Sequence, residues 1–542
     1  MSSAIYAVPI PVNESVLSYA PGTPERKEIK AELERQSSAV MDIPLIIGGK
    51  EIHTSAKSRC VMPHDHRHVL ADFSMAGGAE LKDAVNAAMA AKAQWYSLPW
   101  EHRASIFLKA ADLVAGPWRQ RINAATMLGQ SKTVYQAEID SACELADFLR
   151  FNVHYAQEIY RNQPISPTSV WNRMEYRPLN GFITAISPFN FTAIGGNLSA
   201  APAIMGNTVV WKPASTAVLS NYIFFQILRE AGLPDGVINF VPCKGKDISE
   251  YVMKDQRMAG FHFTGSTEVF SGIWRLVGEH IRIYENYPRL VGETGGKDFI
   301  FAHKSARINP LVTAMIRGAF EYQGQKCSAA SRVYIPESLW PAVKERLLDE
   351  IASIHTGDIR DFRNFMGAVI DEASYRSIVK YIDYAHESAD AEVLCGRYDD
   401  SKGWFIYPTV ILAKTPDFKT MKEEIFGPVL TIYVYPDRQF EETLASCHEA
   451  TPYALTGSIF AQDRVFLNRM EQELADSAGN FYINDKPTGA VVGQQPFGGG
   501  RASGTNDKAG SVLNLLRWTS PRAIKETFLP PESVSYPFMD GE

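Results

Sequence analysis

The chain has 542 residues, of which 45% are hydrophobic and 21% charged, values ordinary for a globular protein long enough for two or more domains. A formal net charge of −7 gives no electrostatic case for binding nucleic acid. No apolar run approaches the roughly 20 residues that a membrane span needs. The six cysteines show no CxxC pair and no paired spacing, which argues against a zinc site and a disulfide framework and favours a reducing compartment.

The N-terminal segment 1–20 contains Glu14 but neither Arg nor Lys. This composition is unlike a secretory signal or an organelle presequence, so we expect a cytoplasmic location in preference to the mitochondrial matrix. Its prolines predict an extended arm lying on the surface. Thr23 is expected to cap a charged helix that has Pro24 at its first position and runs to about Gln36.

The pattern that follows alternates strands and helices, which predicts an α/β fold. Expected helices span 81–95, 102–115 and 195–205, and expected short apolar strands span 181–187, 208–211, 237–241 and 260–264. This order is typical of a dinucleotide-binding sheet, although the rhythm alone does not identify a cofactor. Two further segments, 171–178 and 513–525, resemble strands that project from the body, a usual source of subunit contacts.

The most informative residue is Cys327, which lies in the run Tyr-Gln-Gly-Gln-Lys-Cys-Ser at 322–328. A thiol in a Gly-containing turn that leads into a helix is well placed to react as a thiolate. Taken alone, a cysteine is more often a buried packing residue. Glu293, 34 residues earlier in a Gly-Gly context, is poorly placed for core packing but well placed to reach a cleft. The pair therefore predicts a nucleophile and a general base.

Three turns have the residues that a dinucleotide needs. Gly265 follows an expected strand and precedes a helix, whose free N–H groups suit a phosphate. Since a GxGxxG sequence is absent, a plain strand-to-helix turn remains an alternative. Lys212 and Ser215 end another strand and either reach an adenosine ribose or face solvent. Glu424 and Phe426, on a kinked turn, suit a nicotinamide ribose and its ring.

Taken together, six sequence blocks resemble those of the aldehyde dehydrogenase superfamily over about residues 46–525. In chain order the blocks are 187–191, 211–213, 263–268, 293–297, 324–327 and 424–428. The resemblance implies an N-terminal arm and helix, a Rossmann-type NAD-binding domain, an α/β catalytic domain that holds the thiol, and a β-flap for oligomerisation with a C-terminal tail. The corresponding ranges are 1–40 for the arm and helix, 41–157 and 181–291 for NAD binding, 292–500 for catalysis, and 158–180 with 501–542 for the flap and tail.

The same resemblance implies catalytic roles. Cys327 attacks an aldehyde carbon, Asn190 and the Cys327 backbone N–H stabilise the oxyanion, and Glu293 activates the water that hydrolyses a thioester. The implied cofactor-binding residues are Ser187, Pro188, Phe189, Lys212, Ser215, Gly265, Ser266, Thr267, Glu268, Val269, Glu424 and Phe426. Ser215 stands where many relatives carry a ribose-chelating Glu, so NAD is expected and tolerance of NADP is left open. No metal site is expected.

Within the superfamily, the chain resembles the branch that oxidises L-glutamate γ-semialdehyde in proline catabolism. The likeness rests on residues 136–140, 187–196, 327–328 and the long block 484–508. The implied substrate residues are Glu138, Phe191, Ser328, Gly489, Ala490 and Phe497. The serine and the Gly-Ala turn would bind a carboxylate, the two rings would enclose the carbon chain, and the glutamate would receive an ammonium. A helical glutamate is more often a solvated charge or a structural ion pair, so that role of Glu138 stays open.

Two alternatives remain from different classes. An enzyme of the same fold could act on another semialdehyde, against which Ser328 and the 484–508 block argue. A catalytically silent structural homologue would be expected to lack Cys327, Glu293 or Asn190, and all three are present. The implied partners are a small-molecule substrate and further copies of the chain, without nucleic acid or membrane. A transient contact with proline dehydrogenase is left open.

Overall fold

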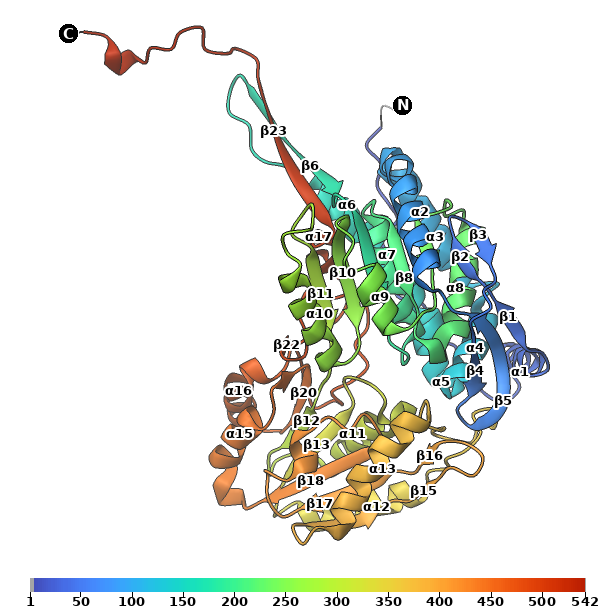
Figure 1. The fold of residues 1–542 in the computed structure, drawn as a ribbon. Helices are drawn as coiled ribbons and strands as arrows, with labels where there is room; N and C mark the ends of the chain where they lie inside the picture. The colour runs from blue at the N-terminus through green and yellow to red at the C-terminus, as the bar shows by residue number, and fades with distance from the viewer. Residues whose placement is uncertain (1–3, 542) are drawn as a thin grey trace.

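Two large sheets organise the computed structural model, which describes residues 4–541 (Figure 1). The first sheet has the strand order β11-β10-β7-β8-β9-β2-β3. Its strands are β2 (Leu45–Ile47), β3 (Lys50–Ile52), β7 (Phe182–Ile186), β8 (Val209–Lys212), β9 (Ile238–Phe240), β10 (Met258–Thr264) and β11 (Arg289–Glu293). The five strands from β11 to β9 are parallel, and β2 and β3 extend the sheet in antiparallel pairs.

The winding of this sheet reverses between β7 and β10. The chain passes from β7 through β8 to β9, then returns to place β10 and β11 on the other side of β7. The crevice beyond the carboxyl ends of β7 and β10 is therefore a topological switch point, where open α/β sheets bind their ligands. Every residue of β10 is buried, as expected for a central parallel strand covered on both faces.

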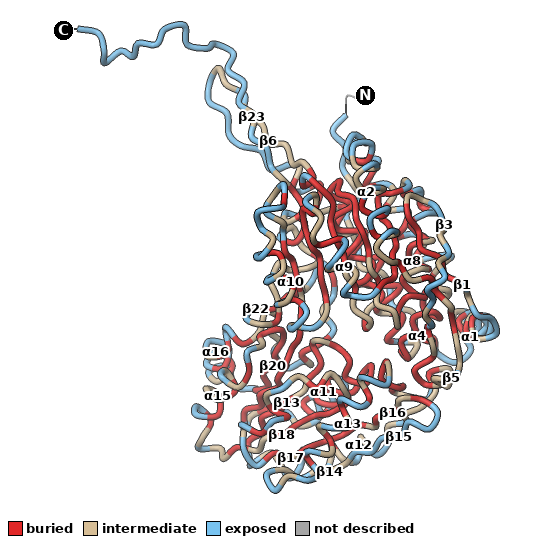
Figure 2. The backbone as a smooth tube through the Cα atoms, in the orientation of Figure 1, coloured by how far each residue is buried: buried red, intermediate tan, exposed pale blue. Residues whose placement is uncertain are grey.

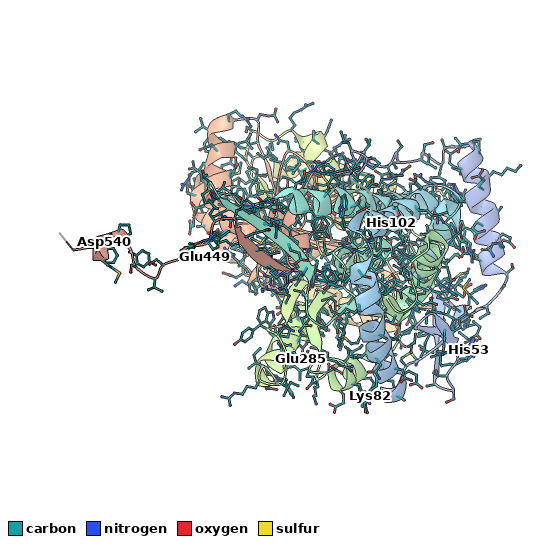
Figure 3. The ribbon with its side chains drawn as sticks, turned by 90° about the horizontal axis from the view of Figure 1, so that it is seen from above. His53, Lys82, His102, Glu285, Glu449 and Asp540 are labelled. Atoms are coloured by element: carbon teal, nitrogen blue, oxygen red, sulfur yellow. The ribbon has the colours of Figure 1, made fainter. Side chains whose placement is uncertain are left out.

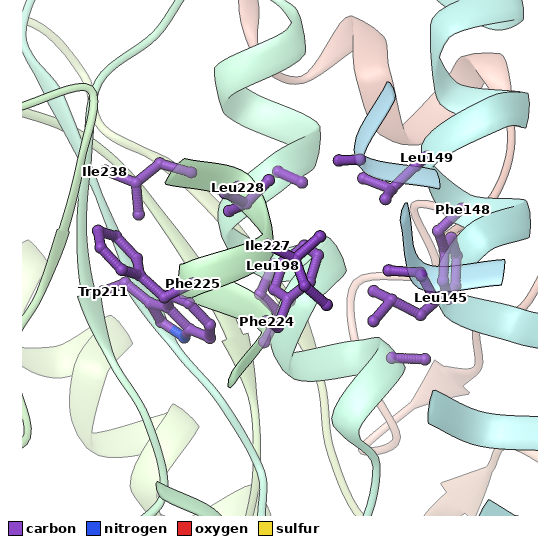
Figure 4. Packing of buried hydrophobic residues seen from close by; sticks show 14 of the residues in the cluster. Leu145, Phe148, Leu149, Leu198, Trp211, Phe224, Phe225, Ile227, Leu228 and Ile238 are labelled. Atoms are coloured by element: carbon purple, nitrogen blue, oxygen red, sulfur yellow. The ribbon is translucent and has the colours of Figure 1, made fainter. Parts of the chain in front are cut away.

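Helices cover both faces of the first sheet because successive strand residues point to opposite sides. Val210 packs in the cluster that contains Leu81 and Val85 of α2, whereas Val209 and Trp211 pack in the cluster of α7 and α8 (Figure 4). The helices of this half are α1 (Pro24–Ser37), α2 (Gly78–Ser97), α3 (Trp100–Ala115), α4 (Arg119–Gln130), α5 (Val134–Ala137), α6 (Leu145–Arg161), α7 (Thr192–Ile204), α8 (Val218–Ala231), α9 (Gly245–Tyr251) and α10 (Thr267–Glu279).

The second sheet also has seven strands, in the order β14-β17-β18-β13-β12-β20-β21, and all pairs except β14·β17 are parallel. Its strands are β12 (Asp298–Ala302), β13 (Ala330–Pro336), β14 (Ala391–Cys395), β17 (Thr409–Ala413), β18 (Val429–Tyr435), β20 (Thr456–Phe460) and β21 (Asn480–Ile483). Its helices are α11 (Ile308–Phe320), α12 (Trp340–Ala352), α13 (Glu372–Glu387), α14 (Lys419–Lys422), α15 (Phe440–Glu449) and α16 (Arg464–Glu473). The buried tubes of Figure 2 follow these two sheets.

Smaller elements complete the body. The short strands are β1 (Met41–Ile43), β4 (Lys57–Met62), β5 (Asp65–Ser74), β15 (Tyr398–Asp399), β16 (Phe405–Ile406), β19 (Tyr453–Ala454) and β22 (Gly500–Arg501). The 3-10 turns are η2 (Ser215–Ala217), η3 (Glu321–Gly324), η4 (Asp437–Gln439), η5 (Ala475–Ser477) and η6 (Pro537–Met539), and η1 (Glu138–Glu144) is a π-helix between α5 and α6. A π-helical turn of this kind often marks a functional region.

A two-stranded ribbon projects from the body (Figure 1). Its strands β6 (Val170–Pro178) and β23 (Thr519–Thr527) are antiparallel over nine residue pairs. Beyond β23 the chain runs outward as a tail, whose Asp540 lies far from the rest of the molecule in Figure 3. The tail exposes large apolar side chains: Phe528, Leu529, Val534, Tyr536, Phe538 and Met539.

The expected α/β fold is confirmed, and the expected helices and strands are present with ends shifted by a few residues. The strand expected at 513–525 is wrong in its first part, because residues 512–516 form the short helix α17 (Val512–Leu516) before β23 begins. Ser511 accepts from the N–H of Leu513 and caps that helix. The expected surface arm is extended, but Tyr19 is only 2% exposed, so part of the arm is packed into the body.

Candidate active site

The carboxyl ends of the parallel strands bring the predicted residues to one crevice. Ser187 follows β7, Lys212 ends β8, Gly265 follows β10 and Glu293 ends β11. After Glu293 the chain crosses to the second sheet, where β12 begins at Asp298. The predicted base therefore lies at the junction of the two sheets, beside the switch point where a ligand is expected.

The segment before the nucleophile has an unusual backbone. Tyr322, Gln323 and Gly324 have φ values of 52°, 54° and 63°, in the left-handed region. Two consecutive non-glycine residues in this conformation cost roughly 1–3 kcal/mol each and persist where the surroundings hold them. A Cβ at Gly324 would collide with the carbonyl oxygen of Gly427, so the close approach of these loops requires glycine.

The side chain of Gln323 holds this backbone in place. Its Nε2 donates to the carbonyl oxygens of Ser131 (3.1 Å) and Ala368 (2.7 Å), and its Oε1 accepts from the N–H of Gly367 (3.0 Å). Each bond is made to a segment distant in sequence, and the residue is fully buried. These bonds offset the backbone strain just upstream of Cys327.

Cys327 itself lies between η3 and β13. The prediction that its turn leads into a helix is wrong, since Ala330 begins a strand. Burial, followed by the carboxylates of Asp298 and Glu293, raises the pKa of the Cys327 thiol well above its ordinary value. The thiol is therefore protonated near neutral pH, and its attack requires that a base remove the proton.

Glu293 has the properties of a general base. Burial raises the pKa of its carboxyl well above the ordinary value, opposed by a backbone bond from Gly499 and by the charge of Lys508. The Gly499 N–H donates to its Oε2 at 3.3 Å. A Cβ at the preceding Gly292 would overlap the ring of Phe270, so glycine is needed for the strand to reach this position. A carboxyl with a raised pKa is suited to proton transfer near neutral pH.

Asn190 joins the loop after β7 to the nucleophile segment. Its Nδ2 donates to the carbonyl oxygen of Gln325 at 3.0 Å. Next to it, the Asp140 carboxylate accepts from the first two amides of α7, those of Thr192 (3.0 Å) and Ala193 (2.8 Å). Asp140 therefore fixes the start of α7, and with it the position of Asn190.

Lys132 supports both sides of the site. Its Nζ donates to Asp140 at 2.6 Å and lies 4.0 Å from the ring centre of Phe191 and 4.5 Å from that of Tyr322. Desolvation lowers the pKa of this lysine, against the opposing effect of Asp140. A buried cation between two rings restricts both rings, because cation–π attraction strengthens when the charge is desolvated.

A cavity of about 630 Å³ connects these groups. Cys327 and Glu293 line it together with five of the six predicted substrate residues: Phe191, Ser328, Gly489, Ala490 and Phe497. The Ser328 hydroxyl is 2.8 Å from that of Thr488, and Gly489 has φ +96°, which leaves the turn free to aim backbone N–H groups at an anion. The cavity thus combines a thiol, a carboxyl base and a turn suited to binding a carboxylate.

The expected cofactor residues lie along the same crevice. Ser187 Oγ accepts from Trp211 Nε1 (2.6 Å), and Ser266 caps α10 by accepting from the N–H of Val269 (3.3 Å). Thr267, Glu268 and Val269 form the first turn of α10, Ser215 opens η2, and Pro188 and Phe189 follow Ser187. Phe189 meets Phe426 edge to face with ring centres 5.8 Å apart.

Lys212 and Glu424 place a cation and an anion in this crevice. The Lys212 Nζ contacts only the carbonyl oxygen of Pro213 among the described residues (3.3 Å), and burial lowers its pKa. A partly desolvated cation without a carboxylate partner fits the oxygens of a ribose or phosphate. Glu424 accepts from the N–H of Gly296 at 2.9 Å, close to the nucleophile. These residues fit a dinucleotide that crosses the switch point.

Comparison with known proteins agrees with this geometry. The model of the aldehyde dehydrogenase family matches residues 52–524. The chain belongs to the aldehyde dehydrogenase family. It is 55% identical over 536 residues to the mitochondrial delta-1-pyrroline-5-carboxylate dehydrogenase of Dictyostelium discoideum, covering 98% of this chain and 96% of that one. The human mitochondrial enzyme of the same name is 49% identical over 529 residues, covering 97% and 94%.

Among solved structures, the crystal structure of the delta-pyrroline-5-carboxylate dehydrogenase from Mycobacterium tuberculosis bound with NAD is similar over 100% of both chains. It is 52% identical in sequence, with a TM-score of 0.97. The fold predicted from the six sequence blocks is thus that of an aldehyde dehydrogenase. The resemblance stated from the sequence is confirmed at the level of the family.

One predicted site residue of this aldehyde dehydrogenase lies elsewhere. Glu138 is fully buried and is not among the residues that line the cavity. Its carboxylate accepts from Arg119, from the Tyr19 hydroxyl (2.8 Å), from Asn123 Nδ2 (2.8 Å) and from the backbone N–H of Leu17 (2.8 Å). With its lone pairs occupied by protein donors, this carboxylate has no place for a substrate ammonium, and the structure gives it a structural role.

Sequence reasoning missed several residues of the site. Lys132 and Asp140 support the nucleophile and the oxyanion residue, and Glu144 places a carboxylate in the cavity. Lys132 and Glu144 lie outside the stretch 136–140 on which the sequence likeness rested, and Asp140 and Glu144 belong to the π-helix η1, which redirects successive side chains. A local pattern based on 3.6 residues per turn does not anticipate that change.

Within residues 4–541 there is no group of three or more His, Cys, Asp or Glu side chains arranged to hold a metal ion. In the same residues no helix combines the length and the apolar character needed to span a membrane. All six cysteines are unpaired thiols.

Proposed function

We infer that this aldehyde dehydrogenase oxidises L-glutamate γ-semialdehyde, the hydrolysed form of 1-pyrroline-5-carboxylate, to L-glutamate with NAD. The observation that carries the inference is the carboxylate-binding turn of Gly489 and Ala490 on the wall of the cavity that holds Cys327. The full-length relatives named above are enzymes of this activity. The reaction belongs to the breakdown of proline.

The first chemical step uses the thiol. Cys327 releases its proton to solvent water and its thiolate attacks the aldehyde carbon, which makes the oxyanion of a thiohemiacetal. The developing oxyanion receives hydrogen bonds from the Asn190 side-chain amide and the Cys327 backbone N–H, and one such donor is commonly worth about 3–4 kcal/mol. When bound, NAD would accept the hydride that leaves the former aldehyde carbon, and the carbon then remains bound to the Cys327 sulfur as a thioester.

The second step releases the product. Glu293 takes a proton from a water molecule, which attacks the thioester carbon and displaces the Cys327 sulfur. L-glutamate leaves with one oxygen from that water. The displaced Cys327 thiolate then takes the proton from the Glu293 carboxyl, because burial raises the pKa of the thiol strongly, and this restores the thiol and the carboxylate.

Substrate recognition rests on groups that surround the cavity. We propose that Ser328 and the turn at Gly489 and Ala490 bind the α-carboxylate, and that Phe191 and Phe497 hold the aliphatic carbons between them. These positions explain why the substrate would have a fixed length between its head and the aldehyde. A site built for a charged head leaves its donors unpaired when that head is missing.

For the substrate ammonium, we propose Glu144 in place of Glu138. Glu14, Asp147 and Glu321 also line the cavity, but each is bonded to protein donors or ion-paired. Among the described cavity carboxylates, Glu144 is the one whose side chain forms neither an ion pair nor a hydrogen bond, whereas Glu293 accepts from the Gly499 N–H. Burial raises the pKa of Glu144 to about 8, and a cationic ligand would lower it. Glu144→Gln is therefore expected to raise KM for the amino-acid aldehyde.

The cofactor residues are proposed as a set: Ser187, Pro188, Phe189, Lys212, Ser215, Gly265, Ser266, Thr267, Glu268, Val269, Glu424 and Phe426. Tolerance of NADP stays a prediction that depends on Ser215. A carboxylate introduced by Ser215→Glu would repel a 2′-phosphate, so the ratio of kcat/KM for NAD over NADP is expected to rise. An unchanged ratio would mean that Ser215 does not face the adenosine ribose.

We also propose that copies of the chain associate through the ribbon of β6 and β23 and the tail beyond it. The exposed aromatic and aliphatic side chains of the tail support this, since isolated apolar segments of this kind usually pack against a partner.

The domain boundaries given from the sequence are retained as a proposal. Cytoplasmic location and a contact with proline dehydrogenase stay predictions; the Dictyostelium and human relatives are named mitochondrial.

The test is NADH formation, followed by absorbance, with a panel of aldehydes. Glutamate semialdehyde is expected to give the highest kcat/KM, well above succinic semialdehyde, betaine aldehyde and butyraldehyde. Free L-glutamate is expected to compete with the substrate, because it presents the same head. Equal efficiency with butyraldehyde would replace the assignment by a generalist dehydrogenase.

A further inference from the structure

The N-terminal arm, residues 4–23, is not a free surface strand. It is extended and precedes α1, and the protein body binds its backbone at intervals. The N–H of Val8 donates to Gln157 Oε1 at 2.7 Å, and the N–H of Leu17 donates to Glu138 at 2.8 Å. The arm therefore follows α6 and the π-helix that precedes it.

Charged side chains fix the middle of the arm. The Glu14 carboxylate accepts from Arg119 Nη1 (2.8 Å) and from Arg150 Nη1 (2.7 Å). Arg119 Nη2 also donates to the carbonyl oxygen of Ser15 at 2.6 Å. Since Arg119 is paired with the fully buried Glu138 as well, the arm is tied to a buried ionic group rather than to a solvated one.

Asn13 connects the arm to two parts of the cavity wall. Its Nδ2 donates to Asp147 of α6 (2.9 Å) and to the carbonyl oxygen of Val492 (2.7 Å). Its Oδ1 accepts from Gln494 Nε2 at 2.9 Å. The N–H of Glu14 donates to the other oxygen of Asp147 (2.7 Å), so both the side chain and the adjacent backbone are held.

The loop that Asn13 holds is the one that carries the proposed carboxylate-binding turn. Val492 and Gln494 follow Gly489 and Ala490 by only a few residues. On its other side the loop packs so closely that a Cβ at Gly493 would overlap the ring of Phe151 in α6. The loop is thus positioned by α6 on one side and by Asn13 on the other.

The arm also forms part of the cavity surface. Asn13, Glu14 and Val16 line the same cavity of about 630 Å³ as Cys327 and Ala490. Glu14 and Asp147, which are 133 residues apart in the chain, therefore meet at one wall of the cavity. An arm in this place closes a side of the cavity that the two sheets leave open.

We propose that Asn13 is a positioning residue for substrate specificity: through its bonds to Val492 and Gln494 it holds the turn at Gly489 and Ala490 in the geometry that binds the substrate carboxylate. The N-terminal arm is then a wall of the substrate site. This inference rests on the proposed function, because it assigns the held turn to the substrate head. It predicts an effect on recognition of the head that is separate from the chemical step.

The test is Asn13→Ala, with Val12→Ala as the matched control, because Val12 is 74% exposed on the same arm. For glutamate semialdehyde we expect KM to rise about tenfold through loss of the bonds to the loop, with kcat within about twofold of wild type. For butyraldehyde, which has no carboxylate head, kcat/KM is expected to stay unchanged. NAD affinity is expected to stay unchanged too. Val12→Ala is expected to match wild type throughout.

A second readout does not depend on activity. Hydrogen exchange of the backbone amides at 488–494, measured by mass spectrometry, is expected to be faster in Asn13→Ala than in wild type and in Val12→Ala. Gln494→Ala removes only the partner of Asn13 on the loop. It should raise KM and speed the exchange as Asn13→Ala does, but by a smaller amount. This variant keeps the test available if Asn13→Ala does not fold.

Equal losses with both aldehydes would overturn the proposal, because a merely structural residue would affect both. Unchanged exchange at 488–494 in both variants would overturn it as well. A wild-type enzyme inactive on glutamate semialdehyde would instead refute the substrate assignment, and the exchange measurement would still test whether the arm holds the loop.

Discussion

At the scale of single residues, burial controls the protonation of the groups on which the site depends. The thiol of Cys327 and the carboxyl of Glu293 both have raised pKa values because both are desolvated at the junction of the two sheets. Each carboxylate near the thiol also makes its ionisation harder. Near neutral pH the thiol is therefore protonated, and the Glu293 carboxyl ionises at a higher pH than an ordinary glutamate.

Cys327→Ala is expected to abolish aldehyde oxidation while NAD still binds, because the cofactor residues lie on other strands. Turnover by NADH absorbance and NAD binding by calorimetry measure the two effects. Activity within about tenfold of wild type would exclude Cys327 as the nucleophile. Cys395→Ala is a suitable control, since this thiol lies on β14 away from the cavity lining.

The pH dependence follows from the direction of the Glu293 shift. A base acts in its ionised form, and a raised pKa moves the ionisation to higher pH than for an ordinary glutamate. We therefore expect thioester hydrolysis to be lost as the pH falls through this raised pKa and to be regained above it. In Glu293→Gln we expect a burst of NADH followed by slow turnover. The loss of activity as the pH falls through this range should be absent in that variant. If the burst vanished in this variant, hydrolysis and hydride transfer would not be separable in this way.

Sequence patterns proposed Cys327, Glu293 and Asn190 as site residues because each lies in a short, distinctive backbone context. Lys132 and Asn13 could not be found in that way. Their roles arise from contacts with segments that the fold brings together, as far apart as Asn13 and Val492, which are 479 residues apart. The choice between Glu138 and Glu144 depended on the π-helix, whose wider turn decides which carboxylate faces the cavity.

At the scale of elements, the π-helix η1 separates structural from binding carboxylates. Its first residue, Glu138, faces inward to Arg119 and the N-terminal arm, and its last, Glu144, lines the cavity. The same short element therefore ties down the arm and presents a side chain to the site. Between its first and last residues an α-helix of seven residues turns through a different angle from this π-helix. It would therefore not direct the same two carboxylates to the arm and to the cavity.

Glu138→Gln is expected to destabilise the protein by at most about 3–5 kcal/mol, because it removes the buried one of the two carboxylates, Glu138 and Glu14, that pair with Arg119. Chemical denaturation measures the loss, with the exposed Glu28→Gln as the control. KM for glutamate semialdehyde in the folded variant should change less than in Glu144→Gln. A large rise in KM with unchanged stability would restore Glu138 to the substrate site.

At the scale of the whole molecule, the cavity and the proposed association surface are separate. The cavity lies between the two sheets, whereas the ribbon and tail extend away from the body (Figures 1 and 3). The tail side chains Val534 and Phe538 are 95% and 83% exposed. Such exposure is costly in water unless another surface covers the tail.

Removal of residues 528–542 is expected to reduce the size of the assembly, measured by light scattering after gel filtration. The NAD-binding and cavity residues lie outside this segment, so each remaining subunit should still bind NAD. A control that replaces exposed polar residues of the tail, such as Glu532→Gln, should leave the assembly intact. An unchanged molar mass after truncation would assign association to the β6 and β23 ribbon alone.

The pairing of β6 with β23 also sets an order in biosynthesis. Residues 170–178 leave the ribosome about 340 residues before their backbone partners at 519–527, a delay of roughly 20–70 s at the usual rates of translation. By the end of that interval the nascent chain can have completed both sheets, whose last strand is β21, but not the ribbon. A message cut short after residue 508 would encode every catalytic and substrate residue and yet produce a subunit with a bare strand edge. Unpaired backbone groups on such an edge can bond to a strand of another chain, so an incomplete copy would be prone to aggregate.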